Sequence, residues 1–191
     1  MGKTSGVLPT PVAVYNGRAM SERLLPGELA ELIRAGGEAL VREALALTPE
    51  VATFHAEPGA WCAHEILGHM IEAERRGFLG RVQQLLAEEN PRLASWDQDA
   101  VARSRNDCAR SLTDLVKEFR LLRAESVGLV FRLREEEMAR GGEHPDVGHL
   151  TVGDVVQEWV YHDRDHIRQL YASVQAYVRP HMGGARRFYE S

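Results

Sequence analysis

The segment from Thr151 to Tyr177 constrains the fold more than any other part of the chain. Its apolar residues recur at alternating intervals of three and four positions, and two histidines fall in the same stripe. Such spacing places side chains along one face of a helix, the face that a helical protein buries against its neighbours. We therefore predict a long helix that carries two imidazoles, one turn apart, on its inward side. The stripe consists of Val152, Val155, Trp159, His162, His166 and Gln169.

A histidine pair four positions apart is only a weak indication of a metal site, because chance also produces such pairs. A third inward histidine strengthens it. His69 lies in another helical stripe, together with Cys62 and Ile66. Three neutral imidazoles on two facing helices suit one divalent cation and leave an open position for water or substrate. We predict that His69, His162 and His166 hold this cation, and because several metals accept imidazole, the sequence does not select among them.

The competing interpretation is that each histidine is an ordinary core or surface residue. Three inward histidines favour the metal site, because burying three imidazoles without a shared purpose costs stability. Glu72 lies one turn from His69, and Asp163 follows His162. Either carboxylate is a candidate to orient a ligand imidazole or to act as a base. The remaining histidines are interpreted as structural or solvent-exposed: His55, His64, His144, His149 and His181.

Composition excludes several classes of protein. The chain has 191 residues with 44% hydrophobic content, enough for one domain with a substantial core. Its net charge of -5 argues against a nucleic-acid partner, and no apolar run approaches the ~18 residues that a membrane span needs. Cys62 and Cys108 are too few for a disulfide framework and suit a reducing compartment. We expect a cytoplasmic protein in which Cys62 is a small core residue, not a nucleophile. The tryptophans Trp61, Trp96 and Trp159 are also interpreted as core.

Helical periodicity divides the chain into four long helices. We expect a bundle over residues 26–178, preceded by an N-terminal arm (1–25) and followed by a C-terminal tail (179–191). Gly36 and Gly37, in the middle of the first helix, either weaken it or mark a close contact. No segment has a convincing strand pattern. The four helices are expected at about residues 26–47, 61–88, 111–137 and 151–177.

Loop lengths predict how these helices are connected. The connections after the first and third helices are short to moderate, which favours antiparallel neighbours. The connection at about residues 90–108 has roughly 19 residues, and at up to ~3.3 Å each it can travel the length of the bundle. The predicted fold is therefore all-α, a four-helix bundle with up-down-down-up topology and a long crossover between helices 2 and 3. In this topology the three histidines can meet at one level.

Several motifs resemble the DinB-like (damage-inducible) superfamily. The resemblance covers about residues 26–175 and is most specific in the last helix. It implies an up-down-down-up bundle with a divalent metal, and by motif position it places the metal ligands at His69, His162 and His166. The residues that carry it are Trp61, His69, Glu72 and Glu74 in the second helix, Trp96 and Asp97 in the crossover, and the runs 148–154 and 162–170.

The same resemblance implies a function. The family includes S-transferases that use bacillithiol, mycothiol or similar thiols, a thiol-dependent isomerase, hydrolase-like members, and members without known activity. We expect a metal-dependent enzyme that transfers a low-molecular-weight thiol to an electrophile, with Zn, Ni or Fe as the foremost metals. The alternatives are a metal-dependent hydrolase and a non-catalytic, metal-binding stress-response protein. Because members of this family often pair, we also expect a homodimer, with apolar groups supplied by Val14, Tyr15 and Phe188.

Overall fold

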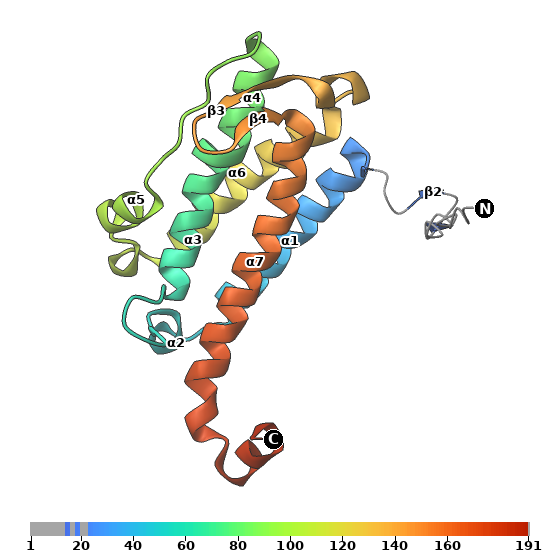
Figure 1. Ribbon diagram of the computed structural model, residues 1–191. Coiled ribbons are helices and arrows are strands. Elements are labelled where there is room, and N and C mark those ends of the chain that lie inside the picture. Colours follow the sequence, from blue (N-terminus) through green and yellow to red (C-terminus); the bar gives the residue numbers. More distant parts are fainter. Residues whose placement is uncertain (1–13, 16–17, 20–22, 191) are drawn as a thin grey trace, which may run out of the picture.

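The computed structural model describes residues 14–15, 18–19 and 23–190 and contains a four-helix bundle (Figure 1). The all-α prediction is confirmed. Helix α1 packs against α6 and α7, and the second helical segment packs against the same two helices. That second segment is built from α3, the π-helix η1 and α4. The bundle elements are α1 (Pro26–Ala46), α3 (Ala63–Glu72), η1 (Ala73–Phe78), α4 (Leu79–Ala87), α6 (Leu112–Arg132) and α7 (Val152–Val178).

The helices follow the predicted up-down-down-up order. Helices α1 and α7 run in one direction, whereas α3, α4 and α6 run in the other (Figure 1). The long connection between α4 and α6 therefore has to return along the bundle, as its length predicted. It contains α5 (Gln98–Arg105) and the 3-10 turn η2 (Asp107–Ala109). Asp97 caps α5 by accepting a hydrogen bond of 2.9 Å from the Ala100 amide.

The prediction that the chain has no strands was wrong. A short antiparallel hairpin joins α6 to α7, and another lies in the expected N-terminal arm. In the hairpin between α6 and α7, the chain reverses its direction next to Gly148, whose φ of 78° favours glycine. The hairpin strand that contains Glu143 also pairs with the crossover, because the Leu93 amide donates to the Glu143 carbonyl at 2.8 Å. The hairpins are β1 (Val14–Tyr15) with β2 (Arg18–Ala19), and β3 (Gly141–His144) with β4 (Gly148–Thr151).

The other boundaries differ modestly from expectation. The third helix ends at Arg132, earlier than predicted, and short helical turns follow it. Of the arm expected at residues 1–25, only 14–15, 18–19 and 23–25 belong to the described residues. None of the described helices is long and apolar enough to cross a membrane. The remaining short elements are α2 (Pro49–Ala52), η3 (Glu135–Ala139), η4 (Arg179–His181) and η5 (Gly183–Tyr189).

A buried charged layer lies between two apolar clusters of the core. Arg123 of α6 donates to both carboxylate oxygens of Asp163, at 2.5 and 2.9 Å, and to Glu74 at 2.7 Å. All three side chains are buried. A Cβ at Gly36 would lie 2.7 Å from an Asp163 oxygen, and one at Gly37 would lie 3.0 Å from the Arg123 side chain. The two glycines thus mark a close contact, one of the two alternatives that the sequence left open.

Candidate metal centre

The structure brings His69, His162 and His166 together, from α3 and α7. The Nε2 atoms of His69 and His162 are 3.0 Å apart, and the His166 ring centre lies 4.5 and 4.4 Å from the other two ring centres. One nitrogen from each ring lies within 4.8 Å of the others. Nitrogens that share one ion at ~2.0–2.1 Å lie about 3 to 3.4 Å apart. The three rings therefore have a spacing that one cation can accommodate with small adjustments.

The chemistry of the three rings also fits a cation. Burial lowers the pKa of His69 to about 3 and that of His162 to about 2, with neighbouring charge as a smaller cause, and burial lowers the pKa of His166 as well. The rings are consequently neutral at pH 7 and keep a lone pair for a metal. The Nδ1 atom of His162 is buried and has no hydrogen-bond partner among the described residues. Because His162 Nε2 is the atom that lies 3.0 Å from His69 Nε2, Nε2 is the nitrogen that this ring offers to a shared cation.

Aromatic side chains surround the histidines. The centre of the Trp61 ring lies 4.8 Å from that of His69, and the Trp96 ring stacks on His69 with ring centres 5.9 Å apart. Both tryptophans are half-buried. Trp61 also packs against an apolar core cluster, as predicted, whereas Trp96 belongs to neither cluster, so the interpretation as core was wrong for Trp96. Trp159 is fully buried and does belong to the core.

The π-helix η1 changes which residues of the second helical segment face the site. Phe78 contacts His162 edge-on, with ring centres 4.9 Å apart. Nine positions separate Phe78 from His69, which on an uninterrupted α-helix is a rotation of about 180°. A π-turn absorbs one extra residue and reduces this difference to about 80°. Apolar periodicity alone did not reveal this insertion.

The two carboxylates named from the sequence bind arginines. Glu72 accepts from Arg76 at 2.6 Å and from Arg105 at 2.7 Å, and Asp163 binds Arg123. Among the described residues, no hydrogen bond joins either carboxylate to a site histidine. Instead, the Nδ1 atom of His166 donates to Gln169 Oε1 at 2.8 Å. The sequence placed Gln169 in the inward stripe but did not predict this contact.

A small cleft of about 380 Å³ adjoins the site at Trp96. Arg81 and Glu158 also line it. The Arg81 guanidinium contacts His144 at 2.9 Å, while its buried Nε has no hydrogen-bond partner among the described residues. Trp96 both lines this cleft and stacks on His69, although none of the three site histidines lines the cleft itself.

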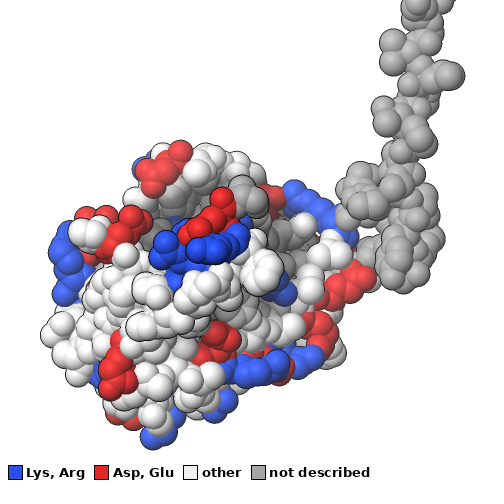
Figure 2. All heavy atoms as spheres, turned by 90° about the horizontal axis from the view of Figure 1, so that it is seen from below, with Lys and Arg blue, Asp and Glu red and all other residues white. Residues whose placement is uncertain are grey.

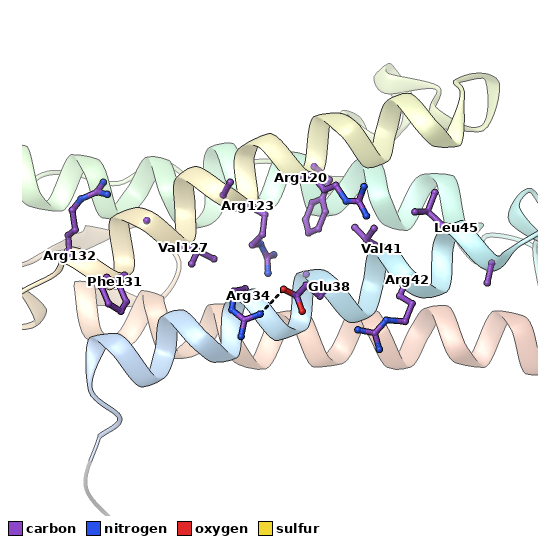
Figure 3. Close-up of a pocket in the computed structure, with 15 residues that line it drawn as sticks. Arg34, Glu38, Val41, Arg42, Leu45, Arg120, Arg123, Val127, Phe131 and Arg132 are labelled. Atoms are coloured by element: carbon purple, nitrogen blue, oxygen red, sulfur yellow. Dashed lines mark hydrogen bonds and ion pairs between the residues drawn. The ribbon is translucent and has the colours of Figure 1, made fainter.

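A larger cavity lies elsewhere. A groove of about 950 Å³ runs between α1 and α6, and its apolar wall is bordered by arginines such as Arg42 and Arg120 (Figure 3). None of the three site histidines lines it. On the molecular face seen in Figure 2, acidic and basic side chains are interspersed over the described surface. The smaller cleft is the better candidate for a substrate site, since the groove has no metal-binding side chains apart from Glu38.

Comparisons with known proteins agree with this geometry. A profile of the DinB superfamily matches residues 33–170. A solved structure from Bacillus subtilis, YfiT, described as a probable metal-dependent hydrolase with an unusual four-helix bundle topology, aligns with a TM-score of 0.74 at 17% identity, covering 84% of this chain and 92% of that one. A conserved protein from Enterococcus faecalis aligns with a TM-score of 0.57 at 11% identity, covering 78% and 94%. No curated protein matches the chain significantly.

Proposed function

The chain belongs to the DinB superfamily, and from its three converging histidines we propose that it is a metal-dependent enzyme that transfers a low-molecular-weight thiol to an electrophile. The observation that carries this proposal is the donor set. Among the described residues, no further His, Cys, Asp or Glu joins the three rings, so the protein supplies three ligands to the group. Catalytic sites use three protein ligands and leave a position open, whereas structural sites are closed.

A divalent cation held by these histidines supplies Lewis acidity, which lowers the pKa of a coordinated thiol or water. The thiol sulfur then forms a bond to the electrophilic atom, whose leaving group departs with its electron pair, and the thiol proton passes to solvent. Trp61, Trp96 and Phe78 keep the surroundings apolar, which strengthens electrostatic interactions at the reacting atoms. The cleft beside Trp96 admits the substrates, and Arg81 offers a cationic contact for an acidic group on the thiol.

A metal-dependent hydrolase is the second candidate. The same three histidines would serve, with water in place of the thiol. This reading is supported by the likeness to the Bacillus subtilis protein described as a probable metal-dependent hydrolase, a likeness that by itself concerns the fold. The two candidates differ in whether turnover consumes thiol.

The test is turnover by the metal-loaded protein. Purified protein reconstituted with Zn²⁺, Ni²⁺ or Fe²⁺ is assayed for loss of free thiol with a chloroaromatic or bimane electrophile, and in parallel for ester and amide hydrolysis. Thiol loss that disappears in His166→Ala supports the transferase. His149→Ala is the matched control, because His149 is exposed and binds Glu143. Hydrolysis without thiol loss supports the second candidate, and inactivity in every metal-loaded assay contradicts both.

Location and assembly belong to the same proposal. Both cysteines are free thiols, which supports a reducing compartment such as the cytoplasm. A homodimer stays a prediction, to be checked by light scattering at micromolar concentration. Phe188, one of the apolar groups expected to contribute, is 84% exposed. The side chains of Val14 and Tyr15 lie outside the described residues.

A further inference from the structure

A second cluster of metal-binding side chains lies apart from the three histidines. It joins the loop after α2, the start of α3 and the turn η2 at the end of the crossover. The Sγ atoms of Cys62 and Cys108 are 2.8 Å apart, and His55 Nε2 lies 3.0 Å from Glu65 Oε2 and 4.0 Å from the Cys108 sulfur. All four donor atoms lie within 4.8 Å of one another.

We propose that His55, Cys62, Glu65 and Cys108 form a structural zinc site. Two thiolates, an imidazole and a carboxylate are the donor types that Zn²⁺ prefers, and four protein ligands close its tetrahedral shell. Binding converts the two thiols to thiolates and releases two protons to solvent, with no change of oxidation state. This site differs in kind from the three-histidine centre, which has three ligands and no sulfur.

The environment of the four groups favours a shared cation. Glu65 has a lowered pKa, because hydrogen bonds from the Cys62 amide and His55 outweigh the effect of burial, so its carboxylate is ionised at pH 7. Burial raises the pKa of both cysteines, and the nearby Glu65 charge adds to this. A buried thiol, Cys62, and a half-buried thiol, Cys108, thus lie beside an ionised carboxylate, and Zn²⁺ would supply the positive charge that favours their thiolate forms. Both cysteines are free thiols in the structure.

Hydrogen bonds within the protein already hold the ligands at the start of α3 and in the turn η2 in place, without the ion. Cys62 is the N-cap residue of α3, and its amide donates to Glu65 Oε2 at 2.9 Å, which fixes these two ligands relative to each other. Cys108 follows Asp107, a buried carboxylate that binds Arg105 at 2.7 Å. A Cβ at Gly68 would lie 1.8 Å from an Asp107 oxygen, so the turn η2 is pressed directly against α3. Preorganised ligands are what a specific metal site requires.

The zinc site would attach the end of the crossover to the start of α3. Cys62 directly follows Trp61, whose ring lies against His69 and His166. A bound ion would thereby hold one aromatic wall of the three-histidine centre in place. The inference does not depend on the activity proposed for that centre, because it concerns different ligands and a different role.

The two sites can be distinguished by cobalt, which replaces zinc and reports its ligands. Metal-free full-length protein, reduced and kept anaerobic, is titrated with Co²⁺. We expect two equivalents to bind, with a thiolate-to-cobalt charge-transfer band in the near ultraviolet. The double variant Cys62→Ser/Cys108→Ser should lose one equivalent and the whole band. His166→Ala, which alters the other centre, should keep the band, and so should the control His149→Ala.

Different results would contradict the zinc site and the function proposed for the three-histidine centre. A wild-type protein that binds metal without any thiolate band overturns the zinc site and leaves the three-histidine centre intact. Reduced protein that is exposed to air with excess Zn²⁺ and forms a Cys62–Cys108 disulfide as fast as without Zn²⁺, seen as a mass loss of two hydrogens with oxygen as the oxidant, also overturns it. Should the double serine variant not fold, thiol reactivity of the wild type gives the answer: Zn²⁺ should protect both cysteines from Ellman's reagent, and unchanged reaction rates contradict the site.

Discussion

Gln169 orients His166: its Oε1 accepts a hydrogen bond of 2.8 Å from the ring Nδ1. Both residues lie on α7, three positions apart, so one helix fixes the geometry of the pair. With Nδ1 engaged, the Nε2 atom of His166 remains for the centre that it forms with His69 and His162. Such an outer partner sets both the tautomer and the direction of a metal-binding imidazole.

Replacing Gln169 by Ala should weaken metal binding without removing a ligand. We expect a loss of about 10- to 100-fold in Zn²⁺ affinity, the usual effect of deleting an orienting partner. Gln169→Glu keeps an acceptor oxygen and should retain most of the affinity. Competition with a chromogenic chelator measures all three proteins. Equal affinities for wild type and Gln169→Ala would show that the hydrogen bond has no orienting role.

The sequence predicted the three histidines that converge in the candidate site, and the reasons for what it missed are physical. Periodicity selects residues that share a helix face, which is why His162, His166 and His69 emerged from apolar stripes. The π-helix between α3 and α4 changes that periodicity. Glu74, which lies in it, binds Arg123 in the core, while Glu72, just before it, binds Arg105 of the crossover. Such an insertion depends on backbone hydrogen bonds and not on a recognisable residue pattern.

Loops were predicted less well than helices. Cys62 and Cys108 are 46 positions apart and meet only because the crossover folds back onto α3. No periodic signal records that contact, since it depends on tertiary packing around Asp107 and Gly68. The hairpin of β3 and β4 was missed for a related reason: its strands are four residues each and one of them pairs with the crossover.

Replacing His166 by Ala should remove the metal and preserve the fold. The helical pair of ligands is reduced to one, so metal content should fall sharply. The apolar stripes of the bundle supply most of the burial, and far-ultraviolet circular dichroism should therefore change little. Metal analysis and circular dichroism are run on the same sample. An unfolded variant would instead indicate that the three-histidine centre is structural.

Replacing Asp163 by Ala should destabilise the fold and leave metal binding nearly unchanged. Its carboxylate is bound by Arg123 inside the core, and removing it leaves a buried cation with fewer partners. We expect the free energy of unfolding to fall by about 3–5 kcal/mol, while Zn²⁺ affinity of the folded protein stays close to that of wild type. Urea unfolding with a parallel Zn²⁺ titration tests both statements. Asp165→Ala is the control, because Asp165 makes an exposed pair with Arg168. A large loss of Zn²⁺ affinity would indicate that Asp163 does orient a ligand imidazole, as the sequence suggested.

The metal-free protein should lose stability as the pH falls below about 6.5, and His162 should account for part of that loss. The pKa of His162 is lowered to about 2 in the folded state, chiefly by burial, from an ordinary value of 6.5. As the pH falls, the His162 ring of the unfolded chain therefore takes up a proton before that of the folded protein. The free energy of unfolding is unaffected by this ring above pH 7 and falls from about pH 6.5 toward pH 2. The slope is about 1.4 kcal/mol per pH unit for one such histidine.

His162→Gln removes this titration and should reduce the slope by about one proton. Urea unfolding in the presence of a chelator, at several pH values between 7.5 and 4.5, gives the slope for each protein. The control His149→Gln changes an exposed histidine and should follow the wild type. Wild type and His162→Gln with parallel pH dependence would mean that His162 takes up its proton in the folded state as readily as in the unfolded chain. Its ring would then be a poor competitor for a cation at mildly acidic pH, since a protonated imidazole has no lone pair to give to a metal.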